Sequence, residues 1–133
     1  MQRYVAAMLC LLLLGCGPQV AHVVMNADNN SGQSGIATVA AKGSGIHVEL
    51  TIGPDPTDGT PQAAHIHSGR CGELGAVEYS LSSVGPTPSD ATHFWSATDL
   101  QSISFKAVTN GAHCINVHSH SDNFLYVSCG NID

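Results

Sequence analysis

The clearest pattern in the chain is a strict alternation of apolar and polar residues between positions 46 and 52. The apolar members are Ile46, Val48, Leu50 and Ile52. Because successive side chains of a strand point to opposite faces, this segment predicts a strand with one buried face. An apolar run at residues 36–41 precedes it, and the connection at residues 42–45 contains two glycines. The two segments therefore predict a β-hairpin.

Further short apolar segments predict strands along the rest of the chain, at residues 63–67, 76–81, 102–108, 113–118 and 125–129. Residues 18–35 are mostly polar after a short apolar patch, which is typical of a tether or a long loop. Residues 53–61 have the composition of a loop, and residues 84–100 are rich in Pro, Ser, Thr and Asp. Since no segment after the first fifteen residues repeats its apolar positions every 3.6 residues, the sequence predicts an all-β protein.

The first fifteen residues have the layout of a secretory signal. Arg3 precedes an apolar run at residues 4–14, which is shorter than the roughly 20 residues of a transmembrane helix. The end of the run, Leu13-Leu14-Gly15-Cys16, resembles a bacterial lipobox, whose cysteine is acylated and becomes the first mature residue. The alternative is an ordinary signal with an incidental cysteine. We expect a signal peptide at residues 1–15, a lipidated N-terminus and tether at residues 16–34, and one folded domain at residues 35–133.

This organisation predicts an exported protein of the bacterial cell envelope, with a lipid on Cys16 as its membrane anchor. We expect it in the outer membrane, facing the periplasm or the cell surface. Without residues 1–15, the chain has three basic residues, Lys42, Arg70 and Lys106, against ten carboxylates. This acidic balance argues against nucleic acid and anionic membrane surfaces as partners.

Histidine and cysteine carry the candidate chemistry. The eight histidines outnumber the four lysines and arginines together, and a neutral imidazole is a common metal ligand. In an oxidising compartment cysteines form disulfides. The predicted domain contains Cys71, Cys114 and Cys129, which is an odd number, so one thiol stays free.

Two histidine pairs have the spacing of metal ligands on strands. In a strand, His65 and His67 point to the same face while Ile66 points to the other. The same holds for His118 and His120 if their strand continues that far. Each pair alone is weak support for a metal site. Their joint occurrence beside cysteines in an exported β domain favours one, with a metal ion as the partner.

The order of these residues resembles the copper/zinc superoxide dismutase family over residues 35–133. Residues 35–48 resemble the opening hairpin of that family, residues 64–67 its copper-binding His-x-His strand, and residues 69–71 its first disulfide cysteine. Residues 116–123 resemble the strand that carries the last copper histidine, and residues 127–132 the closing strand with the partner cysteine. The resemblance implies a Greek-key, immunoglobulin-like β-sandwich or barrel of the Cu/Zn superoxide dismutase type.

The same resemblance implies the residues of the site. Copper would be bound by His65, His67 and His118, and a disulfide would join Cys71 to Cys129. Cys114 would then be the free thiol. It would serve as a small buried apolar residue, as a soft copper ligand beside the histidines, or as an alternative partner of Cys71.

The chain departs from that family at two places. No histidine follows Cys71 closely, where the enzymes carry the histidine that bridges copper and zinc, so we expect the zinc site to be absent. His120 and His93 are the candidates for a fourth copper ligand. No arginine lies a few residues before Cys129, where the enzymes orient superoxide, which leaves Arg70 as the candidate substitute.

Three functions fit these features. The first is copper capture or buffering at the envelope through the three-histidine site, with zinc as the main competitor. The second is a copper-only superoxide dismutase that converts superoxide to hydrogen peroxide and oxygen. The third is a structural or adhesion module related to chordin-type repeats, in which the histidines only form hydrogen bonds. The missing arginine and bridging histidine favour binding over catalysis.

Overall fold

Alternating apolar residues build eight strands in the part of the chain that the structure describes. This computed structural model describes residues 17–54, 59–122 and 124–133. The strands are β1 (Val20–Ala27), β2 (Ser34–Lys42), β3 (Gly45–Gly53), β4 (Gln62–Arg70), β5 (Glu73–Thr87), β6 (Asp90–Leu100), β7 (His113–His118) and β8 (Tyr126–Ile132). One short helix, α1 (Phe105–Val108), lies between β6 and β7.

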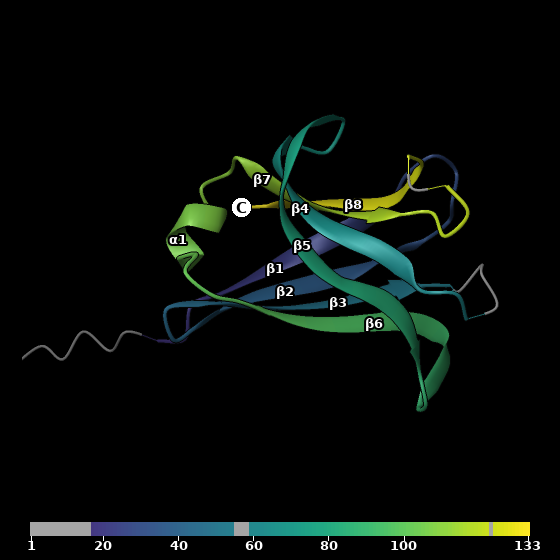
Figure 1. The fold of residues 1–133 in the computed structure, drawn as a ribbon, viewed down its shortest axis with the longest axis horizontal. Coiled ribbons are helices and arrows are strands. Elements are labelled where there is room, and N and C mark those ends of the chain that lie inside the picture. Colours follow the sequence, from purple (N-terminus) through teal and green to yellow (C-terminus); the bar gives the residue numbers. More distant parts are fainter. Residues whose placement is uncertain (1–16, 55–58, 123) are drawn as a thin grey trace, which may run out of the picture.

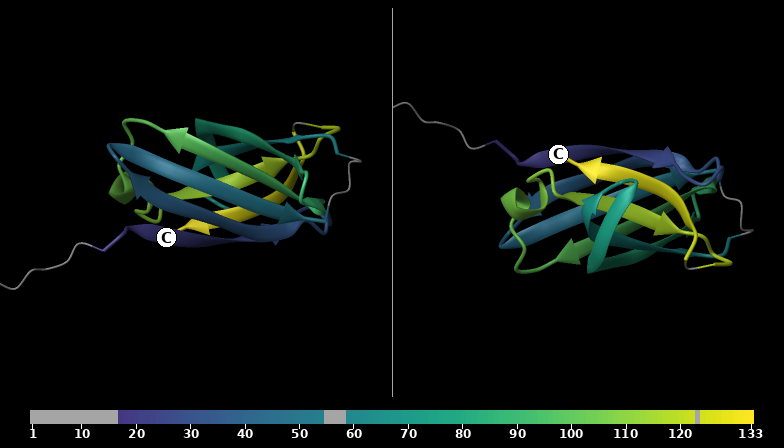
Figure 2. Two further views of the ribbon diagram at one scale, coloured as in Figure 1. Left: turned by 90° about the horizontal axis from the view of Figure 1, so that it is seen from below. Right: turned by 90° about the horizontal axis from the view of Figure 1, so that it is seen from above.

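The strands close into an antiparallel barrel in the order β1-β2-β3-β6-β5-β4-β7-β8. The connections from β3 to β4 and from β6 to β7 join strands that are not neighbours in the barrel, because β3 pairs with β6 and β4 pairs with β7. The first and last strands close the barrel where Asn26 of β1 pairs with Cys129 of β8, and Figure 2 shows these two strands side by side. The all-β prediction is confirmed.

Inward side chains fill the barrel with one apolar core. The predicted hairpin is present as β2 and β3, and all four alternating residues of the second strand are at most 1% exposed. Ile66 of β4 and Ile115 and Val117 of β7 are also fully buried in this core. Residues of β4 and β7 that alternate with these three consequently lie on the outer face of the sheet.

The prediction of a tether at residues 18–35 is wrong for the segment that forms β1. Val23 and Met25 of this strand are each 1% exposed and belong to the core. Val23 pairs with Ala37 of β2, so the barrel begins well before residue 35. The apolar patch in this segment is too short to predict a strand unless its pairing with β2 is known.

Two further elements differ from the sequence prediction. β6 occupies a segment that was predicted to be irregular from its polar composition. Phe94 and Ser96 of this strand point inward, and much of its outer face is exposed. Residues 102–108 do not form a strand. Ser104 caps a helical turn instead, since its hydroxyl accepts a hydrogen bond from the Ala107 amide at 3.1 Å. This helix lies at one end of the barrel, where Val108 is fully buried (Figure 1).

The signal peptide at residues 1–15 and the acylated Cys16 fall outside the described residues. Within the described ranges, no helix has the length and the apolar composition that spanning a membrane requires.

Candidate metal centre

Three histidines meet on the outer face of the sheet formed by β4, β7 and β8. His65 pairs with Asn116 across β4 and β7, and His67 pairs with Cys114. His118 lies at the end of β7 and pairs with Tyr126 of β8. Strand alternation and register thus place all three imidazoles on one surface.

The imidazole nitrogens are close enough to share one ion. One ligand atom from each of His65, His67 and His118 lies within 4.8 Å of the others. His65 Nδ1 and His118 Nε2 lie 2.9 Å apart. Two nitrogens bound to one ion at 2.0–2.1 Å, with an angle of about 90–110°, lie about 2.9–3.4 Å apart. The spacing of this pair is therefore compatible with two ligands of one metal.

His67 is oriented by the backbone of β5. Its Nδ1 lies 3.1 Å from the carbonyl oxygen of Gly75, and because a carbonyl only accepts, Nδ1 carries the hydrogen. A Cβ atom at position 75 would come within 2.2 Å of Ser68 Oγ, so glycine at this position permits β5 to approach β4 closely beside His67. The other nitrogen, Nε2, is buried and has no hydrogen-bond partner among the described residues. Since the hydrogen is on Nδ1, Nε2 has a lone pair that no described donor occupies.

The surroundings of His65 favour its neutral form. Burial lowers the pKa of His65 below its ordinary value of 6.5, and the neighbouring His118 and His67 lower it further by charge repulsion. His67 and His118 are 3% and 7% exposed. A neutral imidazole is the form that binds a metal ion, so His65 is prepared for ligation near neutral pH.

Residues that the sequence analysis did not identify surround the three histidines. The ring of Tyr126 lies edge-on to His118 and His67, with centroid distances of 5.0 and 6.2 Å. Buried Gln62 donates to the His118 carbonyl oxygen at 3.1 Å and exchanges two hydrogen bonds with Gln33. No local pattern marks these residues, because their positions depend on pairing between distant segments.

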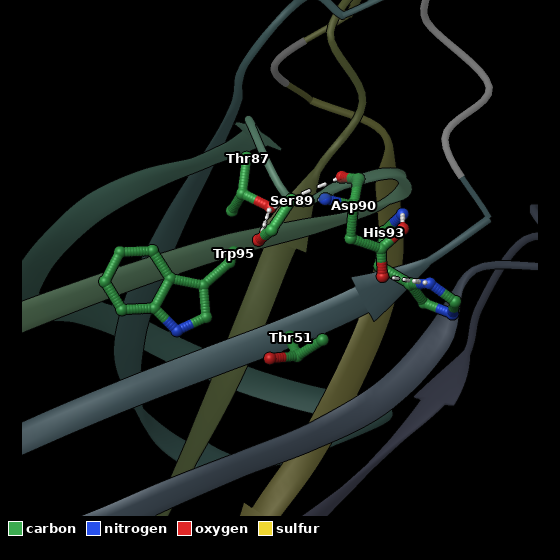
Figure 3. A pocket seen from close by; sticks show the side chains of 6 residues that line it. All are labelled: Thr51, Thr87, Ser89, Asp90, His93 and Trp95. Atoms are coloured by element: carbon green, nitrogen blue, oxygen red, sulfur yellow. Dashed lines mark hydrogen bonds and ion pairs between the residues drawn. The ribbon is translucent and has the colours of Figure 1, made fainter.

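The group of ligand atoms within 4.8 Å of one another includes neither His93 nor His120, the two candidates for a fourth ligand. His93 is on β6, where its Nδ1 lies 3.0 Å from Asp90 Oδ2. It lines a separate pocket with Asp90 and Trp95 (Figure 3). His120 is exposed and follows the end of β7, so strand alternation no longer determines its direction.

Arg70 is committed elsewhere and does not serve the histidine group. Its Nη1 donates to Asp133 Oδ1 and to the Gly111 carbonyl oxygen, each at 2.8 Å. The prediction that Arg70 guides a substrate to the three histidines therefore lacks support.

The cysteines form a second group near the histidines. Cys71 and Cys129 are joined by a disulfide, the pair that the family resemblance implied, and Cys114 is a buried free thiol. The sulfur atoms of all three lie within 4.8 Å of one another.

Comparison with known proteins corrects the family assignment. The CHRD domain family model matches residues 19–123, a range that includes β1 and all three histidines. No curated protein and no solved structure matches the chain. The assignment to the copper/zinc superoxide dismutase-like family is therefore wrong, since it rested on short motifs and on an expected start at residue 35. The chain belongs to the CHRD domain family.

Proposed function

We propose that this protein binds one copper ion through His65, His67 and His118 and captures or buffers copper at the bacterial cell envelope. The observation that carries the proposal is the buried, unpartnered Nε2 of His67 beside the close pair of His65 and His118 nitrogens. An unpartnered buried polar atom costs free energy unless something binds it.

The donor set supports copper over most other ions. Three imidazoles suit Cu(II) by the usual affinity order of divalent metals, and Zn(II) is the main competitor. When bound, copper would supply a Lewis-acidic and redox-active centre. His67 would bind through Nε2, because the Gly75 carbonyl holds the hydrogen on Nδ1. His65 and His118 would bind through the nitrogens that face each other.

The domain keeps these ligands in place through its backbone. Both strands that carry the histidines are paired on both edges, β4 with β5 and β7, and β7 with β4 and β8. Gln62 additionally anchors the carbonyl of His118. Ligands on paired strands lose little conformational freedom on binding, which favours tight binding.

The proposal is for binding, not for superoxide dismutation. Dismutation would benefit from a cation that attracts superoxide, and Arg70 is held by Asp133 and the Gly111 carbonyl. The chain is also acidic, with a formal net charge of −6, which repels an anionic substrate.

Equilibrium titration with Cu(II) and Zn(II) tests this function. We expect one Cu(II) per chain, bound more tightly than Zn(II), and loss of this binding in a His65→Ala/His118→Ala variant. A His47→Ala/His93→Ala variant is the matched control and should keep it. Dismutase activity is assayed on the loaded protein, and we expect none above that of free copper. Equal, weak binding by all three proteins would contradict the proposal and leave a structural envelope module.

A further inference from the structure

The three cysteines of the described chain form a compact cluster on the same sheet face as the histidines. Cys114 of β7 is directly opposite His67, and Cys129 of β8 is directly opposite Asn116. Cys71 follows the end of β4 and is disulfide-bonded to Cys129. Figure 1 shows these three strands along one side of the barrel. Three segments that are distant in sequence thus bring their sulfur atoms within 4.8 Å of one another.

The Cys114 sulfur lies within 4.8 Å of both sulfurs of the disulfide. Once the disulfide is reduced, a modest separation of its two sulfurs would give the spacing of three thiolates around one ion. With metal–sulfur bonds of about 2.3 Å, three thiolates in a trigonal arrangement lie about 4 Å apart. Thiolate ligands select soft ions, and Cu(I) is the soft ion of copper chemistry. Cys114 alone is not a site, but the two sulfurs beside it complete a ligand set.

The disulfide controls whether this set exists. While Cys71 and Cys129 are bonded to each other, neither sulfur is a thiolate, and only Cys114 is available. A dithiol reductant can transfer two electrons and two protons to the disulfide, which breaks the S–S bond and leaves two thiols while the reductant becomes a disulfide. Each thiol that then binds a metal ion releases its proton to solvent.

The disulfide is placed where a reductant can reach it. Cys71 is half-buried and the adjacent Gly72 is exposed, whereas Cys114 is fully buried. Both bonded cysteines line a surface hollow between the β4–β5 turn and β1, together with Gly72 and Asp28.

We propose that Cys71, Cys114 and Cys129 form a second metal site, which binds a soft monovalent ion such as Cu(I) only after the Cys71–Cys129 disulfide is reduced. This site goes beyond the proposed histidine site, and its ligands are entirely different. Because His67 and Cys114 are cross-strand neighbours, the two sites lie side by side on one surface. The protein would bind oxidised copper through imidazoles and reduced copper through thiolates.

The test is anaerobic competition for Cu(I) against a chromogenic chelator, using the whole protein before and after treatment with a phosphine reductant. We expect reduction to tighten Cu(I) binding by at least tenfold. Cys114→Ala should lose most of this gain, although this variant still contains Cys71 and Cys129. The His65→Ala/His118→Ala variant should keep the gain, so failure of the histidine site and failure of this site are distinguishable.

A second readout covers the case in which the reduced protein is less stable. Cu(I) should raise the thermal midpoint of reduced wild type, or restore its fold if reduction unfolds it, because the three sulfurs converge only in the folded barrel. Reduced Cys114→Ala should show at most a small part of this rise. Equal Cu(I) affinity and equal midpoints in reduced wild type and reduced Cys114→Ala would overturn the proposal, as would loss of the gain in the histidine variant.

Discussion

The histidines of this barrel fall into two groups with opposite surroundings. On the β4–β7 surface, His65 and His118 face each other at 2.9 Å, beside His67. On the β3–β6 surface, His47 faces Asp99 at 2.5 Å and also contacts Glu49. A carboxylate stabilises a protonated imidazole, whereas a second imidazole does not. The number of histidines in the sequence therefore does not predict a metal site. The side chains beside each histidine determine whether it can bind a metal ion.

The largest expected effect separates the two groups by copper affinity. His67→Ala removes the nitrogen that has no other partner, and we expect Cu(II) affinity to fall at least a hundredfold, or about 2.7 kcal/mol. His113→Ala is the matched control on β7, because His113 contacts Glu78 at 2.8 Å and lies outside the group. Its affinity should stay within threefold of wild type in competition titrations. Equal losses in the two variants would remove the distinction between the groups.

The contrast between partnered and unpartnered polar groups extends to two buried amides. Gln62 exchanges hydrogen bonds with Gln33, whereas neither amide atom of Asn116 has a partner among the described residues. Gln62→Leu would leave the Gln33 amide unpaired, so we expect the free energy of unfolding to fall by about 1–3 kcal/mol. Asn116→Leu replaces unpaired polar atoms by apolar ones, so we expect no loss.

Denaturant unfolding of the metal-free variants measures this difference. The slope of the free energy against denaturant concentration should be unchanged, so that the midpoints report stability alone. A larger loss for Asn116→Leu than for Gln62→Leu would mean that Asn116 has a partner that the described residues do not include.

The smallest expected effect is a difference in titration between His65 and His47 in the metal-free protein. Hydrogen bonds to Asp99 and then Glu49 raise the pKa of His47, whereas burial and then His118 and His67 lower that of His65. NMR titration should place His47 above and His65 below the ordinary value of about 6.5. Reversed positions would contradict the surroundings described for both residues.

These shifts act on stability in opposite directions. The raised pKa of His47 stabilises the fold at pH values below about 6.5, and this contribution is lost as pH rises through the folded-state pKa. The lowered pKa of His65 makes its protonation unfavourable in the folded state. The fold therefore loses stability as pH falls from about 6.5 toward the folded-state pKa of His65.

Much of the fold was predictable because period-two alternation is a local signal. It identified the β2–β3 hairpin and the core positions of β4 and β7. It failed for β6, whose inward-facing positions include the polar Ser96, and for residues 102–108, where the Ser104 cap favours a helical turn. It also failed for β1, whose role depends on pairing with β2 and β8.

The histidine group was predictable to the same extent. The His65-Ile66-His67 spacing fixes a common face, but the approach of His118 depends on the register between β4 and β7. The contacts of Tyr126, Gln62 and Gly75 with the group arise from three different segments, so no local motif could have revealed them. The family resemblance identified three-dimensional neighbours correctly while assigning the chain to the wrong family.

Anomalous diffraction at the copper absorption edge, from crystals of the Cu(II)-loaded protein, tests the central claim most directly. We expect one strong peak between His65, His67 and His118, within about 2.0–2.1 Å of one nitrogen from each ring. A peak at His47 or His93 with none at the three histidines would contradict it, because copper would then bind histidines that lie outside the three-histidine group.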